Sequence, residues 1–217
     1  MPDIDGKDQH RELTDMGKNQ LLPKSRLEAF SDGVIAIIIT IMVFELKVSP
    51  LFSRETLQKE FWILLPKFIS YAVSFTMLAV LWVNHHHLFH HIRSTDNRLT
   101  WLNMKLLFWM SLIPFGTGFI GANHRLDVAS CLYGAIFFMT ALSFKLLREY
   151  AENQGLMQDP VHPELLRKSR FKSKLTLLIY ALATVSGLVS PWLSFVFIIT
   201  VPVMYIVPSA STGTDGR

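Results

Sequence analysis

Residues 26–44 read RLEAFSDGVIAIIITIMVF, and the character of the chain changes within this stretch. It opens with charged and polar side chains, among them Ser31 and Asp32, whereas the remainder is apolar apart from Thr40. A helix needs about 20 residues, at about 1.5 Å each, to cross the hydrocarbon core of a bilayer. We therefore interpret residues 27–48 as a membrane span that begins with a polar segment.

The composition extends this interpretation to the whole chain. Half of the 217 residues are hydrophobic, 18% are charged, and the mean hydropathy is +0.32. The apolar residues occur in long blocks, which is typical of a chain that crosses a lipid bilayer repeatedly. The net charge is +4, but the basic residues lie at the ends of these blocks, so we expect no nucleic-acid partner. Cys131 is the only cysteine, which excludes an intrachain disulfide and a thiolate metal cluster.

The apolar blocks predict an all-α membrane protein with six transmembrane helices per subunit. No charged residue occurs between Leu175 and Thr214, a stretch long enough for two helices, and Ser190-Pro191 supplies the turn between them. After the first span, the predicted spans are residues 61–87, 101–122, 128–147, 175–189 and 192–207.

The distribution of Lys and Arg predicts the orientation. Basic residues are frequent before the first span and between Arg148 and Lys174, and they are sparse or balanced by acids in the links on the other side. Both termini should therefore face the cytoplasm of a multi-pass protein in the plasma membrane. We expect the longest cytoplasmic loop at residues 148–170.

This orientation divides the chain into three parts. Residues 1–25 form a polar cytoplasmic N-terminus without the apolar core of a signal peptide. Residues 26–208 form the six-helix transmembrane domain, and residues 209–217 form a short polar C-terminal tail.

Polar groups within the first two spans need partners. An Asp at the centre of a membrane helix costs about 2.5–3.5 kcal/mol, so Asp32 should lie near the interface or meet hydrogen-bond donors. Ser31, directly beside it, favours a buried polar network.

Five of the eight histidines lie between His85 and His91, at the cytoplasmic end of the second span. Two pairs are spaced i, i+4, as a divalent metal would require, but no carboxylate follows until Asp96. We therefore predict no metal site, and favour imidazoles that hydrogen-bond to the first helix near Ser31 and Asp32.

The first span also has two different faces. At about 100° per residue, Ile37, Thr40, Ile41 and Phe44 fall on one side, opposite the side that carries Ser31. One face presents bulky apolar groups with a single hydroxyl, and the other presents polar anchors to the rest of the subunit.

Two motifs in this region resemble those of the transmembrane protein 175 family of potassium-permeable channels, in its single-repeat bacterial form. They are Arg26-x-x-x-Phe30-Ser31-Asp32 at the start of the first span and Trp82-x-x-His85-His86 on the second. The resemblance implies a homotetramer in which the first helix of each subunit lines a central pore. It also implies a channel without a re-entrant filter loop, and no Thr-Val-Gly-Tyr-Gly occurs in this chain.

The resemblance further implies roles for individual residues. The principal hydrophobic constriction falls on Ile37, the hydroxyl layer on Thr40, and the outer layers on Ile41 and Phe44, where the family would have an aliphatic residue at the last position. An intrasubunit polar network is expected to join the first helix to the second and third; its members are Arg26, Phe30, Ser31, Asp32, His85, His86 and Asn103. Permeant potassium ions are the expected partners, and no cofactor is expected.

A narrow apolar ring gates by dewetting and makes an ion shed part of its hydration shell, which favours potassium modestly over sodium. We therefore expect a leak-type cation channel. The alternative is a secondary transporter or divalent-metal carrier that uses the His85–His91 cluster and Asp32. An enzyme is not expected, because no Gly-x-Ser-x-Gly or His-Glu-x-x-His motif occurs.

Overall fold

The structure of the protein is a computed structural model that describes residues 23–46, 57–158 and 163–206. These residues form helices joined by short connections, which confirms the all-α class. The predicted N-terminal segment up to residue 22 and the predicted tail at 209–217 lie outside the described residues. The elements are α2 (Lys24–Ile41), η1 (Met42–Glu45), α3 (Leu57–His91), α4 (Asn97–Ser111), α5 (Ile113–Ala122), α6 (Asp127–Asn153), α7 (Pro163–Gly187) and α8 (Pro191–Ile206).

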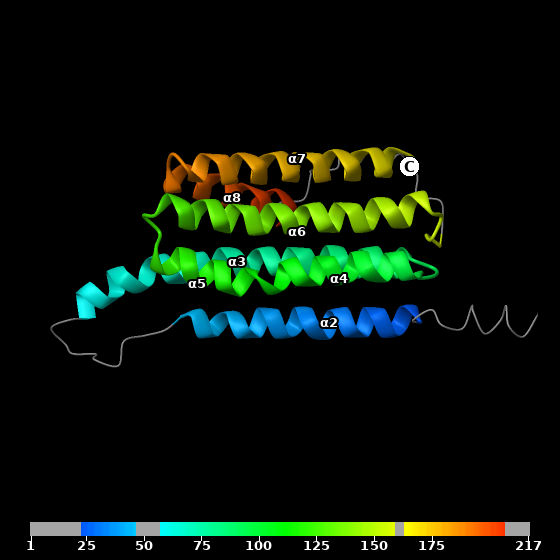
Figure 1. Ribbon diagram of the computed structural model, residues 1–217, viewed down its shortest axis with the longest axis horizontal. Helices are drawn as coiled ribbons and strands as arrows, with labels where there is room; N and C mark the ends of the chain where they lie inside the picture. The colour runs from blue at the N-terminus through cyan, green and yellow to red at the C-terminus, as the bar shows by residue number, and fades with distance from the viewer. Residues whose placement is uncertain (1–22, 47–56, 159–162, 207–217) are drawn as a thin grey trace, which may run out of the picture.

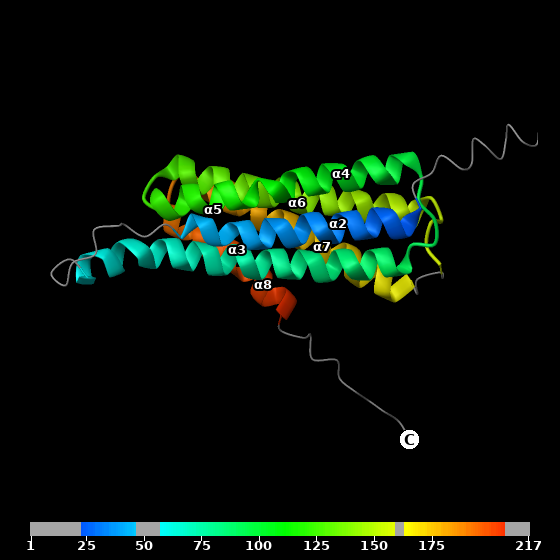
Figure 2. The same ribbon diagram turned by 90° about the horizontal axis from the view of Figure 1, so that it is seen from below.

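The helices run roughly parallel to one long axis, in layers (Figure 1). One layer holds α3, α4 and α5; α2 lies on one side of it, and α6, α7 and α8 lie on the other. Seen from below, α2 lies between α3 and the α4–α5 pair (Figure 2). The helix that the sequence singled out is therefore at the edge of the subunit, with one face against its neighbours and one face free.

Four helical segments in the described residues are long and apolar enough to cross a membrane. They are Lys24–Glu45, Leu64–His91, Asn97–Ala122 and Asp127–Asn153. The apolar helix α8 is shorter, at 16 residues, and α7 begins with a charged segment.

Prolines shape two of the predicted spans. The predicted span 101–122 is divided into α4 and α5 at Leu112, because Pro114 has no backbone N–H and its ring excludes the carbonyl of Met110. Pro66 lies inside α3, and the first turns of this helix bend away from the remainder (Figure 1). Helix α3 and the α4–α5 pair still each run the length of the bundle (Figure 1).

The connection between α6 and α7 differs from the prediction. The expected loop at residues 148–170 is wrong over most of its length, because α6 continues to Asn153 and α7 begins at Pro163. Charged residues with good helix propensity extend both helices beyond their apolar parts. The predicted turn at Ser190-Pro191 is confirmed, since α7 ends at Gly187 and α8 begins at Pro191.

Helix α6 packs most closely against α7, and small residues allow this approach. A Cβ atom added to Gly187 would lie 2.8 Å from the backbone nitrogen of Cys131. One added to Gly134 would lie 3.0 Å from the backbone nitrogen of Thr184. Close backbone contact at small residues is a common source of helix association in membranes.

Asp96 caps α4 and joins it to α6. Its Oδ1 accepts a hydrogen bond from the backbone N–H of Leu99 (2.6 Å), and its Oδ2 accepts one from the Tyr150 hydroxyl (2.5 Å). We expect Asp96→Ala to lower the free energy of unfolding by about 1–2 kcal/mol, as for other lost N-caps. Thermal unfolding in detergent measures this loss. Asp96→Asn, which keeps a capping oxygen, should lose clearly less; equal losses would contradict the capping role.

Candidate pore helix and its polar anchor

The free face of α2 is a continuous stripe. The exposed fractions of the large apolar side chains on it are 57% for Ile37, 44% for Ile41 and 69% for Phe44, and Thr40 is exposed beside them. The opposite face is buried against α3, α4 and α5 through Leu27, Ser31, Ile35, Ile38 and Met42. The predicted division of this helix between an apolar face and an anchoring face is therefore present in the structure.

Side-chain size varies along the stripe. Between Phe30 and Ile37 its exposed residues are the small Gly33 and Ala36, whereas bulky apolar side chains follow from Ile37 onward. Copies of α2 arranged about one axis would leave more room at the small residues and less at Ile37. The sequence position at which this change occurs is the predicted principal constriction.

Thr40 has its hydroxyl proton occupied within the helix. Its Oγ1 donates to the carbonyl oxygen of Ile37, at 2.9 Å. Because the proton points back into the helix, the oxygen lone pairs remain available on the exposed face. Such an oxygen can accept from water or coordinate a cation.

A fully buried network ties α2 to α3 and α4. Asn103 Nδ2 donates to Ser31 Oγ (2.7 Å), and Asn103 Oδ1 lies 2.9 Å from His85 Nε2. All three side chains are 0% exposed. Since Oδ1 only accepts, His85 must carry its proton on Nε2, and its Nδ1 has no hydrogen-bond partner in the described part of the chain.

A second, less buried link lies beside this network. Trp82 Nε1 donates to Asp32 Oδ1 at 3.0 Å, and the indole stacks on the His86 ring, with 5.8 Å between ring centroids. His86 Nδ1 lies 4.0 Å from Glu28 Oε1. Asp32 thus meets a donor from α3, as the sequence required, but that donor is a tryptophan which the predicted set did not include.

The structure does not bring Arg26 and Phe30 into these contacts. Arg26 is exposed, and its side chain makes no hydrogen bond or ion pair with a described residue; Phe30 is 53% exposed on the free stripe. Their part in the network stays a prediction.

The histidine cluster does not converge. His85 is buried toward Asn103 and His86 lies beside Glu28, while His91 Nδ1 is 2.7 Å from the carbonyl oxygen of His87. Within the described ranges, no group of three His, Cys, Asp or Glu side chains could hold a metal ion. The arrangement therefore gives no support to a carrier that binds metal through these histidines.

One end of the bundle is strongly basic. It is the end where α2 begins, α3 and α6 end, and α7 begins (Figure 1). The opposite end has few basic groups among the described residues; Lys59, Lys67 and Arg125 lie toward it. The basic residues at the first end are Lys24, Arg26, Arg93, Arg98, Lys145, Arg148, Arg167, Lys168, Arg170, Lys172 and Lys174.

The chain is similar to known channel proteins. Residues 26–114 match the family described as the endosomal/lysosomal potassium channel TMEM175. A potassium channel of Chryseobacterium sp. (strain P1-3) is 36% identical over 86% of this chain and 94% of the relative. A potassium channel of Chamaesiphon minutus is 33% identical over 80% of this chain and 91% of the relative.

A solved structure agrees with these matches. The crystal structure of a lysosomal potassium-selective channel TMEM175 homolog from Chamaesiphon minutus superposes with a TM-score of 0.73 at 28% identity. The superposed region covers 84% of this chain and 96% of the homolog's chain. The predictions of a multi-pass membrane protein that is not an enzyme are confirmed.

Proposed function

Because the chain belongs to the TMEM175 channel family, we propose that it is a potassium-permeable channel whose pore is lined by α2 from four identical subunits. The observation that carries this proposal is the free stripe of α2. A helix held on one side by a buried polar network, and free on the other, is built to present that second side to a pore.

The chemistry of the stripe suits weak cation selectivity. Four Ile37 side chains meeting at an axis form an apolar constriction that empties of water when it is narrow. When it is open, an ion passes by losing part of its hydration shell, which costs potassium less than sodium. Modest potassium selectivity follows without a carbonyl-lined filter.

Thr40 lies one turn beyond this constriction, with its oxygen available to a passing ion. We expect Thr40→Ala to lower the potassium-to-sodium permeability ratio and leave a conducting channel, because the oxygen layer is lost while the Ile37 ring remains. Reversal potentials under potassium and sodium gradients measure the ratio. Thr40→Ser keeps the hydroxyl and should stay near wild type; a ratio unchanged in Thr40→Ala would remove Thr40 from the selectivity mechanism.

The charge distribution supports a cytoplasmic location for the basic end of the bundle. With six spans per subunit, both termini would then lie in the cytoplasm of a plasma-membrane protein. The odd-numbered and even-numbered spans run in opposite directions along the bundle, consistent with this topology (Figure 1).

Reconstitution of the purified chain into planar bilayers tests the function. With potassium on one side and sodium on the other, a channel gives unitary currents that reverse at a potential favouring potassium. A secondary transporter based on Asp32 would instead give saturable flux without unitary currents, and that result would contradict the proposal.

A further inference from the structure

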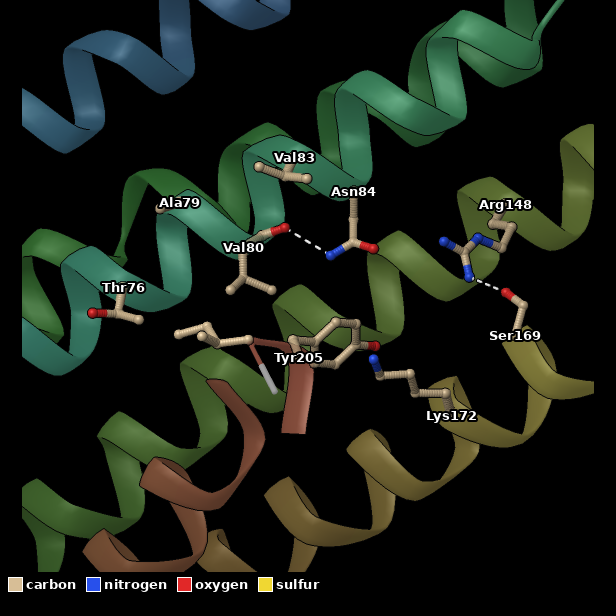
Figure 3. Close-up of a pocket in the computed structure, with 10 residues that line it drawn as sticks. Thr76, Ala79, Val80, Val83, Asn84, Arg148, Ser169, Lys172 and Tyr205 are labelled. Carbon is tan, nitrogen blue, oxygen red and sulfur yellow. Dashed lines mark hydrogen bonds between the residues drawn. The ribbon is translucent and has the colours of Figure 1, made fainter. Parts of the chain in front are cut away.

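A cavity of about 550 Å³ lies on the side of the bundle away from α2. It is formed by α3, α6, α7 and α8, near the basic end, and its volume is that of a typical small-ligand site. None of the residues of the polar anchor lines it. Figure 3 shows its walls, with Thr76, Val80 and Asn84 of α3 facing Lys172 of α7 and Tyr205 of α8.

Two cationic side chains point into this cavity. Arg148 comes from α6 and Lys172 from α7, and in Figure 3 both extend toward the space between Asn84 and Tyr205. Arg148 donates to Ser169 Oγ, and its guanidinium carbon lies 5.0 Å from the centre of the Phe144 ring.

Neither cation forms an ion pair with a carboxylate among the described residues, although Glu152, one turn along α6, lies on the same side as Arg148. Lys172 Nζ lies 3.8 Å from the centre of the Tyr205 ring. Nearby, Glu152 is engaged by Arg170 (3.1 Å). Among the described residues, no carboxylate lines the cavity or lies within ion-pair distance of Arg148 or Lys172. The cavity therefore has an excess of positive charge.

Most of the remaining lining comes from the membrane-spanning part of α3 and is largely apolar. Ala79, Val80 and Val83 form a hydrocarbon wall that leads away from the two cations, and Ile206 of α8 is a further apolar lining residue. Asn84 adds a polar group at the cationic end of this wall. A ligand that fits must carry negative charge at one end and hydrocarbon at the other.

We propose that this cavity binds an anionic phospholipid, with its phosphate between Arg148 and Lys172 and an acyl chain along the α3 wall. Basic pockets between transmembrane helices on the cytoplasmic side commonly hold such headgroups. Free phosphate would use the two cations but not the apolar wall. The inference requires a membrane around the bundle, and it is independent of which helix lines the pore.

Native mass spectrometry of the full-length protein tests the proposal, with phosphatidylglycerol as the anionic probe and phosphatidylcholine as the zwitterionic comparison. Wild type should retain phosphatidylglycerol preferentially, and Arg148→Gln with Lys172→Gln should weaken its binding about tenfold or more. The matched control is Arg167→Gln with Lys168→Gln, which removes the same charge from exposed positions of α7. Equal binding by both double variants would overturn the proposal.

Two single variants separate the remaining outcomes. Lys172→Gln removes the charge and the contact with the Tyr205 ring but breaks no side-chain hydrogen bond among the described residues. An unfolding temperature equal to that of wild type would assign its loss of binding to the lost charge. Ala79→Phe fills the apolar wall and should weaken lipid binding while leaving both cations in place. If Ala79→Phe binds phosphatidylglycerol as wild type does, the apolar wall does not hold an acyl chain and the lipid assignment is wrong. The assignment is also wrong if inorganic phosphate displaces the lipid equally well from wild type and from Ala79→Phe, because the site is then a phosphate site.

Discussion

Ile37→Asn should increase the single-channel conductance several-fold and bring the potassium-to-sodium permeability ratio close to one. Ile37 is 57% exposed on the free face of α2, directly after the small exposed residues Gly33 and Ala36. An amide of similar size removes the dewetting barrier without opening a cavity in the subunit core. A reduction in the barrier of about 1.4 kcal/mol raises the rate of ion passage about tenfold.

Leu178→Asn is the matched control for this substitution. Leu178 is also 57% exposed and also becomes an amide, but it lies on α7, at the far side of the bundle from α2 (Figure 1). Its currents should match wild type. If Ile37→Asn leaves conductance and selectivity unchanged in an assembled channel, Ile37 is not the constriction.

Asn103→Ala should destabilise the subunit more than any other polar truncation in the α2 anchor. The amide holds both Ser31 and His85, and all three groups are inaccessible to water. Its loss leaves the His85 N–H buried without its acceptor, at a cost of about 1–3 kcal/mol. We expect a lower unfolding temperature in detergent and less assembled channel in the membrane.

Two comparisons make this prediction specific. Asn97→Ala alters the same residue type on the same helix at an exposed position, and should have little effect. Asp32→Ala should impair folding or assembly less than Asn103→Ala, because the Trp82–Asp32 hydrogen bond is partly exposed. A cycle combining Asn103→Ala with His85→Ala should show a coupling of about 0.5–3 kcal/mol. Additive losses would mean that the two side chains do not act together.

The first helix could be predicted almost completely from the sequence. Its apolar run fixed the span, and the helical period placed Ile37, Thr40, Ile41 and Phe44 opposite Ser31, as the structure has them. Both signals are local, because a helix determines which of its own residues share a face.

Contacts between helices were harder to predict from the sequence. The period of α3 alone does not tell which of its histidines meets Asn103, and Trp82 as the donor to Asp32 depends on how α2 and α3 are rotated. The Trp82 indole N–H, one turn before His85 and His86 on the same helix, was the available signal.

Helix ends were also harder to predict than helix centres. The hydrophobic pattern marks where a helix is apolar, not where its hydrogen bonding stops, so α6 and α7 extend through charged residues into the predicted loop. Pro114 causes the break at Leu112. The prediction of one continuous span at 101–122 followed the hydropathy and did not take this proline into account.

Cysteine accessibility measures most directly whether α2 lines the pore. Both test variants are made in a Cys131→Ser background. Phe44→Cys places a thiol on the free stripe of α2, near the end of the bundle opposite the basic end. Val189→Cys, the control, places a thiol in the exposed α7–α8 turn at the same end. A positively charged thiol reagent, applied from that side, should modify both. If α2 lines the pore, potassium current should fall only in Phe44→Cys; full modification of Phe44→Cys with undiminished current would contradict a pore lined by α2.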